Sequence, residues 1–434
     1  MADAKTGPRA PESFWQHIRS LGPGLVVALT WLGAGDLVDS AVAGGNYGYA
    51  LMWAMALALF VRFVFVSIVA KYQLCNQHGE SVLSGLKRVH PAMPLFVAVV
   101  AVIFGHIYGS FLVRGLGLAS EALLGFGAPF AWSAFWVGAA AVFVFRGLYR
   151  RLEPVFYVFL AMLSISVIGV AAWSGPDPVA AAKGVLLFEV PEQQGSYGAL
   201  LVIVSLIGAV GGSIANLLYP YFIQQKGWRG PQFRRVQLYD LAFGVGVLMF
   251  LNLSVWVIGA EVLHARGETI ASLADLAKLL TIALGDLGAP IFYVGVFAAV
   301  YSSVIGMAMG FGYLVTDALR VHRAADSVPA EPFDAGARPA YRAVIVWCLF
   351  SPLVWSLPGA PDFIFLTLVG SAATVVVLPV LCGALWILTA RGAFIGTEWR
   401  NRWWENGFLA ALFVLSIWGA WQSIVSIIDA AGWG

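Results

Sequence analysis

Eleven long apolar stretches divide this chain of 434 residues, and they constrain its fold more than any other feature. Most of them reach the about 20 residues that a helix needs to cross a bilayer. Inside hydrocarbon each backbone N–H and C=O must be paired within the protein, and a helix pairs them within its own segment. The sequence therefore predicts an all-α integral membrane protein. The stretches lie near residues 22–48, 50–72, 94–120, 129–147, 153–174, 197–225, 238–262, 288–316, 342–357, 361–388 and 407–429.

The scarcity of charge excludes other classes of protein. Only 11% of the residues are charged and 60% are hydrophobic, whereas an ordinary soluble domain carries about 25% charged residues. A soluble enzyme, a nucleic-acid binder and a disordered scaffold are therefore excluded. The three cysteines are far apart and form no CxxC pair, so neither a disulfide framework nor a zinc site is predicted.

The basic residues test the order of the spans, because cytoplasmic loops of membrane proteins carry an excess of Lys and Arg. All but five of the 25 Lys and Arg residues fall in alternate segments between the spans, starting with the N-terminal one. The exceptions are Lys183, Arg266 and Lys278 in the opposite loops and Arg62 and Arg114 inside spans. We therefore expect a multi-pass plasma-membrane protein with a cytoplasmic N-terminus and an external C-terminus.

The domain organisation follows from the same spans. Residues 1–20 are mostly polar and lack a short apolar core followed by a cleavage site, so we expect a cytoplasmic segment and no cleaved signal peptide. Nothing beyond this has the composition of a soluble domain. Residues 21–430 are therefore predicted to form a single transmembrane domain.

The first span has an unusual centre, Gly33-Ala34-Gly35-Asp36, with a second carboxylate at Asp39. Each glycine weakens a helix by about 1 kcal/mol relative to alanine. A carboxylate at mid-depth of a bilayer costs about 2.5–3.5 kcal/mol, and such residues generally mark functional sites. We interpret Asp36 as a functional residue. Asp39 either contributes to the same site or forms an ion pair, with Arg62 as the expected partner.

The sixth span has a comparable centre, Gly208-Ala209-Val210-Gly211-Gly212-Ser213, followed by Asn216 and Pro220. Close helix packing at Gly208 and Gly212 is the simpler interpretation. However, two glycine-interrupted spans that lie five spans apart are typical of an inverted repeat with a substrate site between broken helices. The repeats are expected at about 21–175 and 196–390, with an extra helix at about 407–429.

The chemistry of these two centres favours a cation site. Unwound helices present free carbonyl oxygens, and the C-terminal ends of half-helices carry partial negative charge. Asp36 adds a carboxylate, and no Lys or Arg stands beside either break in the sequence. An anion site would need half-helix N-termini and a basic residue instead.

The stretch GPGLVVALTWLGAGDLVDSAVAGGNYGY resembles the first span of the Nramp family of divalent-metal transporters, which reads GPG, then DPGN, then AGxxYGY. DLAFGVGVLMFLNLSVWVIGAEVL and LLTIALGDLGAPIFYVGVFAAVYSSVIGMAMG are similar to the seventh and eighth spans of that family. The resemblance implies a LeuT-type fold of five plus five helices with one extra helix, eleven transmembrane helices in all, of which helices 1 and 6 are broken.

The chain also departs from the family pattern. Where the family has DPGN this chain has Gly33-Ala34-Gly35-Asp36, so an aspartate occupies the asparagine position. In span 6 the family has a metal-binding methionine in GAxxMPH. Without gaps that methionine aligns with Gly212, and in a shifted register Asn216 is the corresponding residue. Because loss of a soft thioether favours hard cations, the pattern resembles Nramp-related magnesium transporters, which carry hydrated Mg²⁺ and Mn²⁺.

The resemblance implies a set of site residues and no cofactor, since the metal ion is the substrate. The expected metal ligands are Asp36, Asn216 and the backbone near Gly33, Ala34 and Ala209. The residues expected to shape the site are Gly35, Gly211, Gly212, Ser213, Asp39 and Tyr301. The expected partners are a divalent metal ion and the lipid bilayer, with no nucleic acid and no obligate protein partner.

A further departure concerns coupling to protons. Proton-coupled Nramp members carry a DxxE-type acidic pair in span 3 and a histidine in span 6, whereas span 3 here has only Glu121, at its far end. We therefore expect uptake that is not proton-coupled. The alternatives are a proton-coupled Mn²⁺ or Fe²⁺ transporter and a LeuT-type carrier of amino acids or organic solutes. No phosphate-binding GxxxxGK[ST] motif or hydrolytic constellation is present, so the chain is not expected to be an enzyme.

Overall fold

The computed structural model describes residue 16 and residues 34–147, 149–193, 195–211 and 213–432. Apart from Gln16, the predicted segment 1–20 and the first half of the first span lie outside these residues. Within the described ranges the chain is helical, with loops and isolated bridge residues such as the pair Glu80 and Pro329. The prediction of an all-α protein is confirmed.

The long helices coincide with the predicted apolar stretches. In the described part of the chain, eight helical segments are long and apolar enough to cross a membrane, whereas α3, α7 and α15 are shorter. Eleven transmembrane helices therefore remain a prediction. The bounds are α3 Ala34–Tyr47, α4 Met52–Cys75, α6 Met93–Leu124, α7 Pro129–Phe145, α8 Tyr149–Trp173, α10 Ala199–Leu206, α11 Tyr219–Gln225, α12 Arg234–Ile258, α14 Gly288–Arg323, α15 Pro339–Phe350, α16 Phe363–Ala373, α17 Leu378–Ala390 and α19 Trp403–Ala430.

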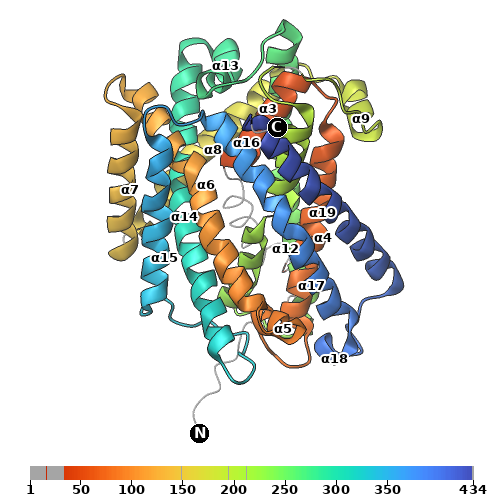
Figure 1. The fold of residues 1–434 in the computed structure, drawn as a ribbon. Helices are drawn as coiled ribbons and strands as arrows, with labels where there is room; N and C mark the ends of the chain where they lie inside the picture. The colour runs from red at the N-terminus through yellow and green to blue at the C-terminus, as the bar shows by residue number, and fades with distance from the viewer. Residues whose placement is uncertain (1–15, 17–33, 148, 194, 212, 433–434) are drawn as a thin grey trace.

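Short helices, which the apolar stretches do not predict, lie at the two ends of the molecule (Figure 1). At one end are α5, Val82–Val89, and α18, Gly392–Ile395. At the opposite end are α9, Pro178–Leu186, and α13, Leu273–Leu284. The starts of α5, α9 and α13 are marked by side-chain caps that satisfy the first free backbone N–H groups. Ser81 caps α5, Asp177 caps α9, and Ser272 with Asp275 forms a capping box at α13.

Helix α5 is fixed to the end of α14 by Lys87. Its ammonium donates hydrogen bonds to the carbonyls of Val321 at 2.9 Å, His322 at 3.2 Å and Ala324 at 2.6 Å. These are carbonyls that the end of an α-helix leaves without intrahelical partners. The loop after α14 is joined to α5 as well. The Ser84 hydroxyl donates a hydrogen bond to the Val328 carbonyl and accepts one from the Val328 N–H.

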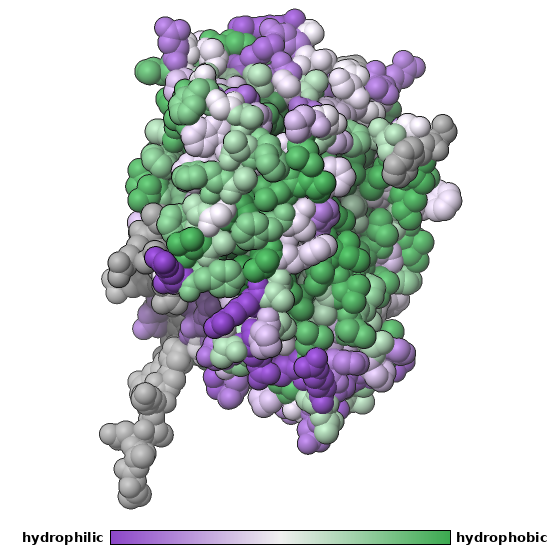
Figure 2. Space-filling model, turned by 60° about the vertical axis from the view of Figure 1, so that its left-hand side comes forward, coloured by the Kyte–Doolittle hydropathy of each residue, from purple (hydrophilic) through white to green (hydrophobic). Residues whose placement is uncertain are grey.

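The surface between the two ends is apolar. Figure 2 shows a broad hydrophobic belt with hydrophilic residues concentrated above and below it. The belt includes large side chains such as Ile165, Val158 and Val414, which are 71%, 66% and 65% exposed. Such a surface is stable in contact with lipid and unstable in water. The fold is therefore that of a multi-pass membrane protein.

The interior places the interrupted part of span 6 against α3, the helix that carries Asp36. Helix α6 packs along α14, and α3 packs against α12. The sixth span is interrupted after α10, first by a π-helical turn, η1, at Ile207–Gly211, and then by a 3-10 turn, η2, at Ile214–Leu218. The turn η1 lies against both α4 and α16. These contacts place the interrupted part of span 6 next to the helices that carry the remaining site residues.

Candidate functional site

The break in span 6 frees backbone groups at the centre of the molecule. Between η1 and η2, Ser213 has an extended backbone with φ −64° and ψ 134°, and its hydroxyl accepts a hydrogen bond from the Ala215 N–H. Ser213 therefore acts as the N-cap of the second half of the span. Gly212, which the sequence assigns to this break, lies outside the described residues. The predicted interruption of span 6 is confirmed.

Glycine at two positions allows η1 to approach its neighbours. A Cβ added to Gly208 would lie 2.0 Å from the Ser371 carbonyl oxygen and 2.7 Å from Thr374 Oγ1. A Cβ added to Gly211 would lie 3.1 Å from both the Ala58 carbonyl oxygen and Val61 Cγ1. Residues 208 and 211 are therefore in close contact with α16 and α4 respectively. This packing positions the Ala209 carbonyl between the two helices.

Asp36 lies in the first turn of α3, which begins at Ala34. A carboxylate is favoured there by the helix dipole. Asp36 is 4% exposed, and its carbonyl accepts a hydrogen bond of 2.7 Å from the Ser40 hydroxyl. Gly35 is also buried, and a Cβ added to it would lie 3.6 Å from Ser371 Oγ. Gly33 and the segment before it lie outside the described residues.

Arg62 of α4 reaches both predicted elements of the site. Its Nη1 lies 3.4 Å from Asp36 Oδ2, and its Nη2 donates a 2.8 Å hydrogen bond to the Ala209 carbonyl. The expectation that Arg62 pairs with Asp39 is therefore wrong, as is the expectation that no basic residue stands beside the breaks. The sequence could not show this contact because the helix containing Arg62 is apolar on every side and gives no indication of which face is buried.

The arrangement brings two hard oxygen ligands to one cationic group. The Asp36 carboxylate comes from α3 and the Ala209 carbonyl comes from η1, and both contact the terminal nitrogens of one guanidinium. Both oxygens therefore lie within 3.4 Å of the same guanidinium. Carboxylate and carbonyl oxygens are ligands that Mg²⁺, Ca²⁺ and Mn²⁺ prefer. In this structure the two oxygens hold a cation that belongs to the protein, the Arg62 guanidinium.

Asp39 lies one turn further along α3 and is fully buried. The Ser205 and Ser371 hydroxyls lie beside its carboxyl group, although no hydrogen bond of ordinary geometry joins it to a described residue. Asp39 and Asp36 are close enough to interact electrostatically. The centre therefore contains two acidic side chains and one arginine.

Tyr108 is a site residue that the sequence analysis missed. This α6 side chain forms a hydrogen bond of 2.8 Å between its hydroxyl and the Ser213 hydroxyl at the break of span 6. Its ring also stacks on Phe311 of α14. The signal in the sequence is a phenol in span 3, between His106 and Ser110. Such a hydroxyl does not by itself indicate its partner.

Two other predicted site residues have different surroundings. The Asn216 amide donates a 3.0 Å hydrogen bond to the Gly211 carbonyl, and its Oδ1 accepts none from a described residue. Asn216 thus supports the break and has a ligand oxygen available. Tyr301 of α14 is buried among the rings of Trp136, Phe156 and Phe297. No contact between Tyr301 and Asp36 is found in the described part of the chain.

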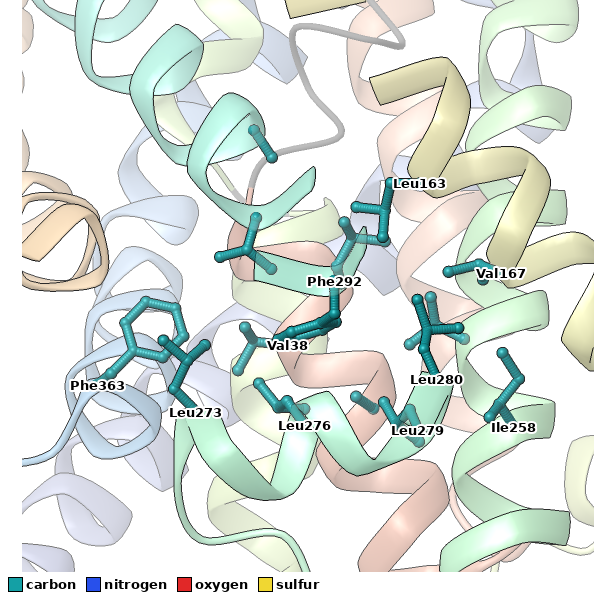
Figure 3. A pocket seen from close by; sticks show the side chains of 15 residues that line it. Val38, Leu163, Val167, Ile258, Leu273, Leu276, Leu279, Leu280, Phe292 and Phe363 are labelled. Atoms are coloured by element: carbon teal, nitrogen blue, oxygen red, sulfur yellow. The ribbon is translucent and has the colours of Figure 1, made fainter. Parts of the chain in front are cut away.

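A small cavity next to α3 offers no ligands to a cation. Figure 3 shows this space of about 40 Å³, which apolar side chains such as Val38, Leu280 and Phe292 line. Empty apolar cavities of this kind typically stay dry. Among the described residues there is also no cluster of three or more His, Cys, Asp or Glu side chains that could hold a metal. The apolar cavity is therefore not a candidate for binding a cation.

His106 and Arg114 of α6 are held by structural hydrogen bonds. His106 Nδ1 lies 2.9 Å from Ser351 Oγ, and the Trp355 indole N–H donates to His106 Nε2 at 2.9 Å. Arg114 donates to the Trp355 carbonyl at 3.1 Å. Both ring nitrogens of His106 thus have partners, and the side chain links α6 to the turn after α15.

Comparison with known proteins identifies the family. The family model described as "Natural resistance-associated macrophage protein-like", or Nramp, matches residues 24–426. The divalent metal cation transporter MntH of Chromohalobacter salexigens is 24% identical over 307 residues, covering 68% of this chain and 70% of that protein. MntH of Deinococcus radiodurans is 24% identical over 316 residues, covering 70% of each chain.

Solved structures agree on the fold. A manganese transporter of Eremococcus coleocola, solved as a mutant, superposes with a TM-score of 0.72 at 16% identity, covering 98% of this chain and 90% of that one. MhsT in complex with L-phenylalanine superposes with a TM-score of 0.60 at 15% identity, covering 93% and 98%. The fold is of the LeuT type, as predicted, and the chain is a transporter rather than an enzyme. With the family model matching nearly its whole length, this chain belongs to the Nramp family.

Proposed function

We propose that this protein is a secondary transporter that moves divalent metal ions through the site at Asp36. The observation that carries the proposal is the convergence of the Asp36 carboxylate and the Ala209 carbonyl on one cationic group. The two oxygens come from the elements that family members use as broken helices. Relatives named as divalent metal cation and manganese transporters support the substrate class.

The ligand chemistry favours Mg²⁺ and Mn²⁺ as substrates. No methionine occurs between Gly208 and Pro220, so this part of span 6 provides no thioether for a softer metal. Oxygen from Asp36, Ala209 and the free Oδ1 of Asn216 would suit a hard ion that retains several water molecules. Asp39 places a second carboxyl group one turn further along α3. Gly33, Ala34, Gly35, Gly211, Gly212 and Ser213 provide backbone and space.

We propose that transport proceeds without proton coupling. Span 3 contains no acidic pair, and His106 has partners at both ring nitrogens, which argues against a relay through that residue. The membrane potential alone would provide about 4.6 kcal/mol per 100 mV for a divalent ion, twice the value for a single charge. That is sufficient for inward accumulation. The proposed location is the plasma membrane.

Arg62 favours a second candidate function. A guanidinium at the centre of a LeuT-type fold binds carboxylates well, and MhsT is described in complex with an amino acid. A carrier of small organic anions or zwitterions would therefore be the alternative. It should be inhibited by its carboxylate substrate and insensitive to divalent metals.

Uptake into proteoliposomes tests the proposed function. Vesicles that contain a metal-sensitive dye and a pH reporter would receive Mn²⁺ or Mg²⁺ under an inside-negative potential. We expect metal entry without acidification and mutual competition between the two ions. Metal-driven proton entry would exclude the uncoupled mechanism, and failure of both ions to enter would exclude metal transport.

Variants at Asp36 connect this activity to the site. Asp36→Ala should abolish uptake, but it leaves the Arg62 guanidinium without its carboxylate in the interior, which can prevent folding. The double variant Asp36→Ala with Arg62→Met removes both charges and should fold while remaining inactive. The matched control is Asp286→Ala, at an exposed aspartate outside the core, which should transport normally. Full activity of the double variant would remove Asp36 from the site.

A further inference from the structure

Arg62 connects α3 and η1, the two elements of the proposed metal site, through its charged guanidinium group. It lies near the middle of α4 and is 2% exposed. Its guanidinium contacts Asp36 of α3 with one terminal nitrogen and the Ala209 carbonyl of η1 with the other. A buried arginine requires partners of this kind. Both partners are atoms that the proposed function assigns to the metal.

The backbone fixes this contact in place. Gly211 allows η1 to lie against Ala58 and Val61 of α4, directly before Arg62. On the other side of η1, Gly208 is in contact with the Ser371 carbonyl of α16. The Ala209 carbonyl is therefore held between two helices, within reach of the guanidinium. Arg62 occupies the site because of how the elements pack, and not through a flexible surface contact.

Two cations cannot use these oxygens at the same time. A divalent ion bound to Asp36 and Ala209 would lie within a few ångströms of the guanidinium, where like charges in a medium of low dielectric constant repel strongly. Each cation would also remove ligands from the other. Occupation by Arg62 and occupation by the metal must therefore alternate.

We propose that Arg62 is a tethered cation that fills the metal site in the metal-free protein and leaves when the metal binds. This inference rests on the proposed function and adds a regulatory element to the same site. Arg62 lowers the apparent affinity for metal, because only the molecules in which it has moved away can bind. It also neutralises Asp36 in the empty transporter. The empty site can then change conformation without an unpaired carboxylate in the interior.

The two effects predict different changes in binding and in flux. Without Arg62 the oxygens are available, so the metal should bind more tightly. The empty site would then carry an uncompensated carboxylate, so the return of the empty transporter should become slow. Net uptake requires that return, whereas exchange of internal for external metal does not. Loss of Arg62 should therefore slow net uptake of the metal while exchange continues.

The test uses the full-length protein with Arg62→Met, in which a flexible, unbranched and uncharged side chain replaces the arginine. Mn²⁺ binding is measured by calorimetry, and fluxes of radioactive Mn²⁺ are measured in empty vesicles and in vesicles loaded with Mn²⁺. We expect binding about tenfold tighter, from a metal-free state in which Arg62 fills the site in about nine molecules of ten. Net uptake should fall about tenfold while exchange persists.

Two further variants separate charge from folding. Arg114→Met, the matched control, removes another intramembrane arginine, which contacts the Trp355 carbonyl and not the site; it should change neither binding nor the ratio of exchange to net uptake. Arg62→Lys retains a cation and should keep the lower affinity. Thermal unfolding with and without Mn²⁺ verifies that each variant is folded.

Several results would overturn the inference. Unchanged Mn²⁺ affinity of folded Arg62→Met would do so, as would a parallel loss of exchange and net uptake. If the original protein takes up no metal, the proposed function fails by itself. In that case Mn²⁺ binding by Arg62→Met would still support the tethered cation, and absence of binding would reject it.

Discussion

At the residue scale, the centre of the molecule is determined by a buried pair of opposite charges. Asp36 and Arg62 are 4% and 2% exposed. Removal of one partner from a buried ion pair costs about 3–5 kcal/mol, because the remaining charge has no compensation. Replacement of both by apolar residues is often close to neutral. Asp36 and Arg62 are therefore coupled, and single variants must be compared with the double variant.

The sequence indicates one member of this pair and not the other. Asp36 is identified by its own neighbours, because glycines and a carboxylate coincide in an apolar span. Arg62 lies 26 positions from Asp36 and 147 from Ala209. Nothing local specifies either contact. An arginine in an apolar helix has no amphipathic pattern that assigns its face, so its partners depend on the tertiary packing.

Gly208 provides a prediction about packing. In Gly208→Ala the new methyl group would lie 2.0 Å from the Ser371 carbonyl oxygen, which belongs to the backbone of α16 and cannot rotate away. Overpacking of this kind costs about 1–3 kcal/mol. We expect a lower thermal unfolding temperature in detergent and loss of uptake.

Gly246→Ala is the matched control for this variant. Gly246 is also in a helix, α12, but a Cβ there has nothing within 4 Å. Alanine favours the helix over glycine by about 1 kcal/mol, so stability should be unchanged or slightly higher. Equal stability of the two variants would show that the contact between η1 and α16 is not tight.

At the scale of elements, the sequence predicts the long apolar helices and does not predict the short helices between them. The bounds of α4, α6 and α19 follow closely from their apolar stretches, because hydrocarbon imposes the length. The short helices α5, α9 and α13 lie at the ends and depend on caps and tertiary contacts. The break in span 6 is predictable from its glycines, but its π-helical and 3-10 turns are not.

The connection between α11 and α14 yields a prediction at this scale. The Tyr221 hydroxyl donates a 2.9 Å hydrogen bond to Asp317 Oδ2, and the Arg320 guanidinium contacts Asp317 Oδ1 at 2.7 Å. In Asp317→Asn the bond that Tyr221 of α11 donates to a carboxylate of α14 becomes a weaker bond to a neutral amide, so α11 should separate from α14 more often. Hydrogen exchange of the backbone of α11 should become faster, while exchange in α12 should be unchanged.

The control for this variant is Asp326→Asn, in the exposed loop after α14. This substitution removes the same charge outside the contact between α11 and α14. Exchange in α11 should be the same as in the original protein. If both variants or neither of them accelerate exchange in α11, the contact at Asp317 does not control the separation of the two helices.

At the scale of the whole molecule, the distribution of charge predicts orientation. The apolar belt separates the end that contains α5 and α18 from the end that contains α9 and α13 (Figures 1 and 2). The sequence places most Lys and Arg residues in the segments at the first end, which the positive-inside rule assigns to the cytoplasm. Helix α19 ends at the opposite side of the belt.

Reporter fusions test this orientation. Alkaline phosphatase, which is active only outside the cytoplasm, is expected to be active when fused after Gly434. It should be inactive when inserted at Gly336, in the loop between α14 and α15. The reverse pattern of activity would place the N-terminus outside. Activity at both positions, or at neither, would contradict the predicted number of spans between them.

The position of Lys87 determines where the end of the molecule that contains α5 can open. Its three hydrogen bonds attach α5 to the end of α14, so moving these two helices apart would break all three. Between α11 and α14, a single hydrogen bond from the Tyr221 phenol must break at the Asp317 contact. The Tyr221 and Tyr313 rings also join α11 to α14. Since each hydrogen bond contributes about 1 kcal/mol net, hydrogen bonding holds α11 to α14 more weakly than it holds α5 to α14. An exit path at this end would therefore run along α11, with α5 and α14 moving as one rigid body.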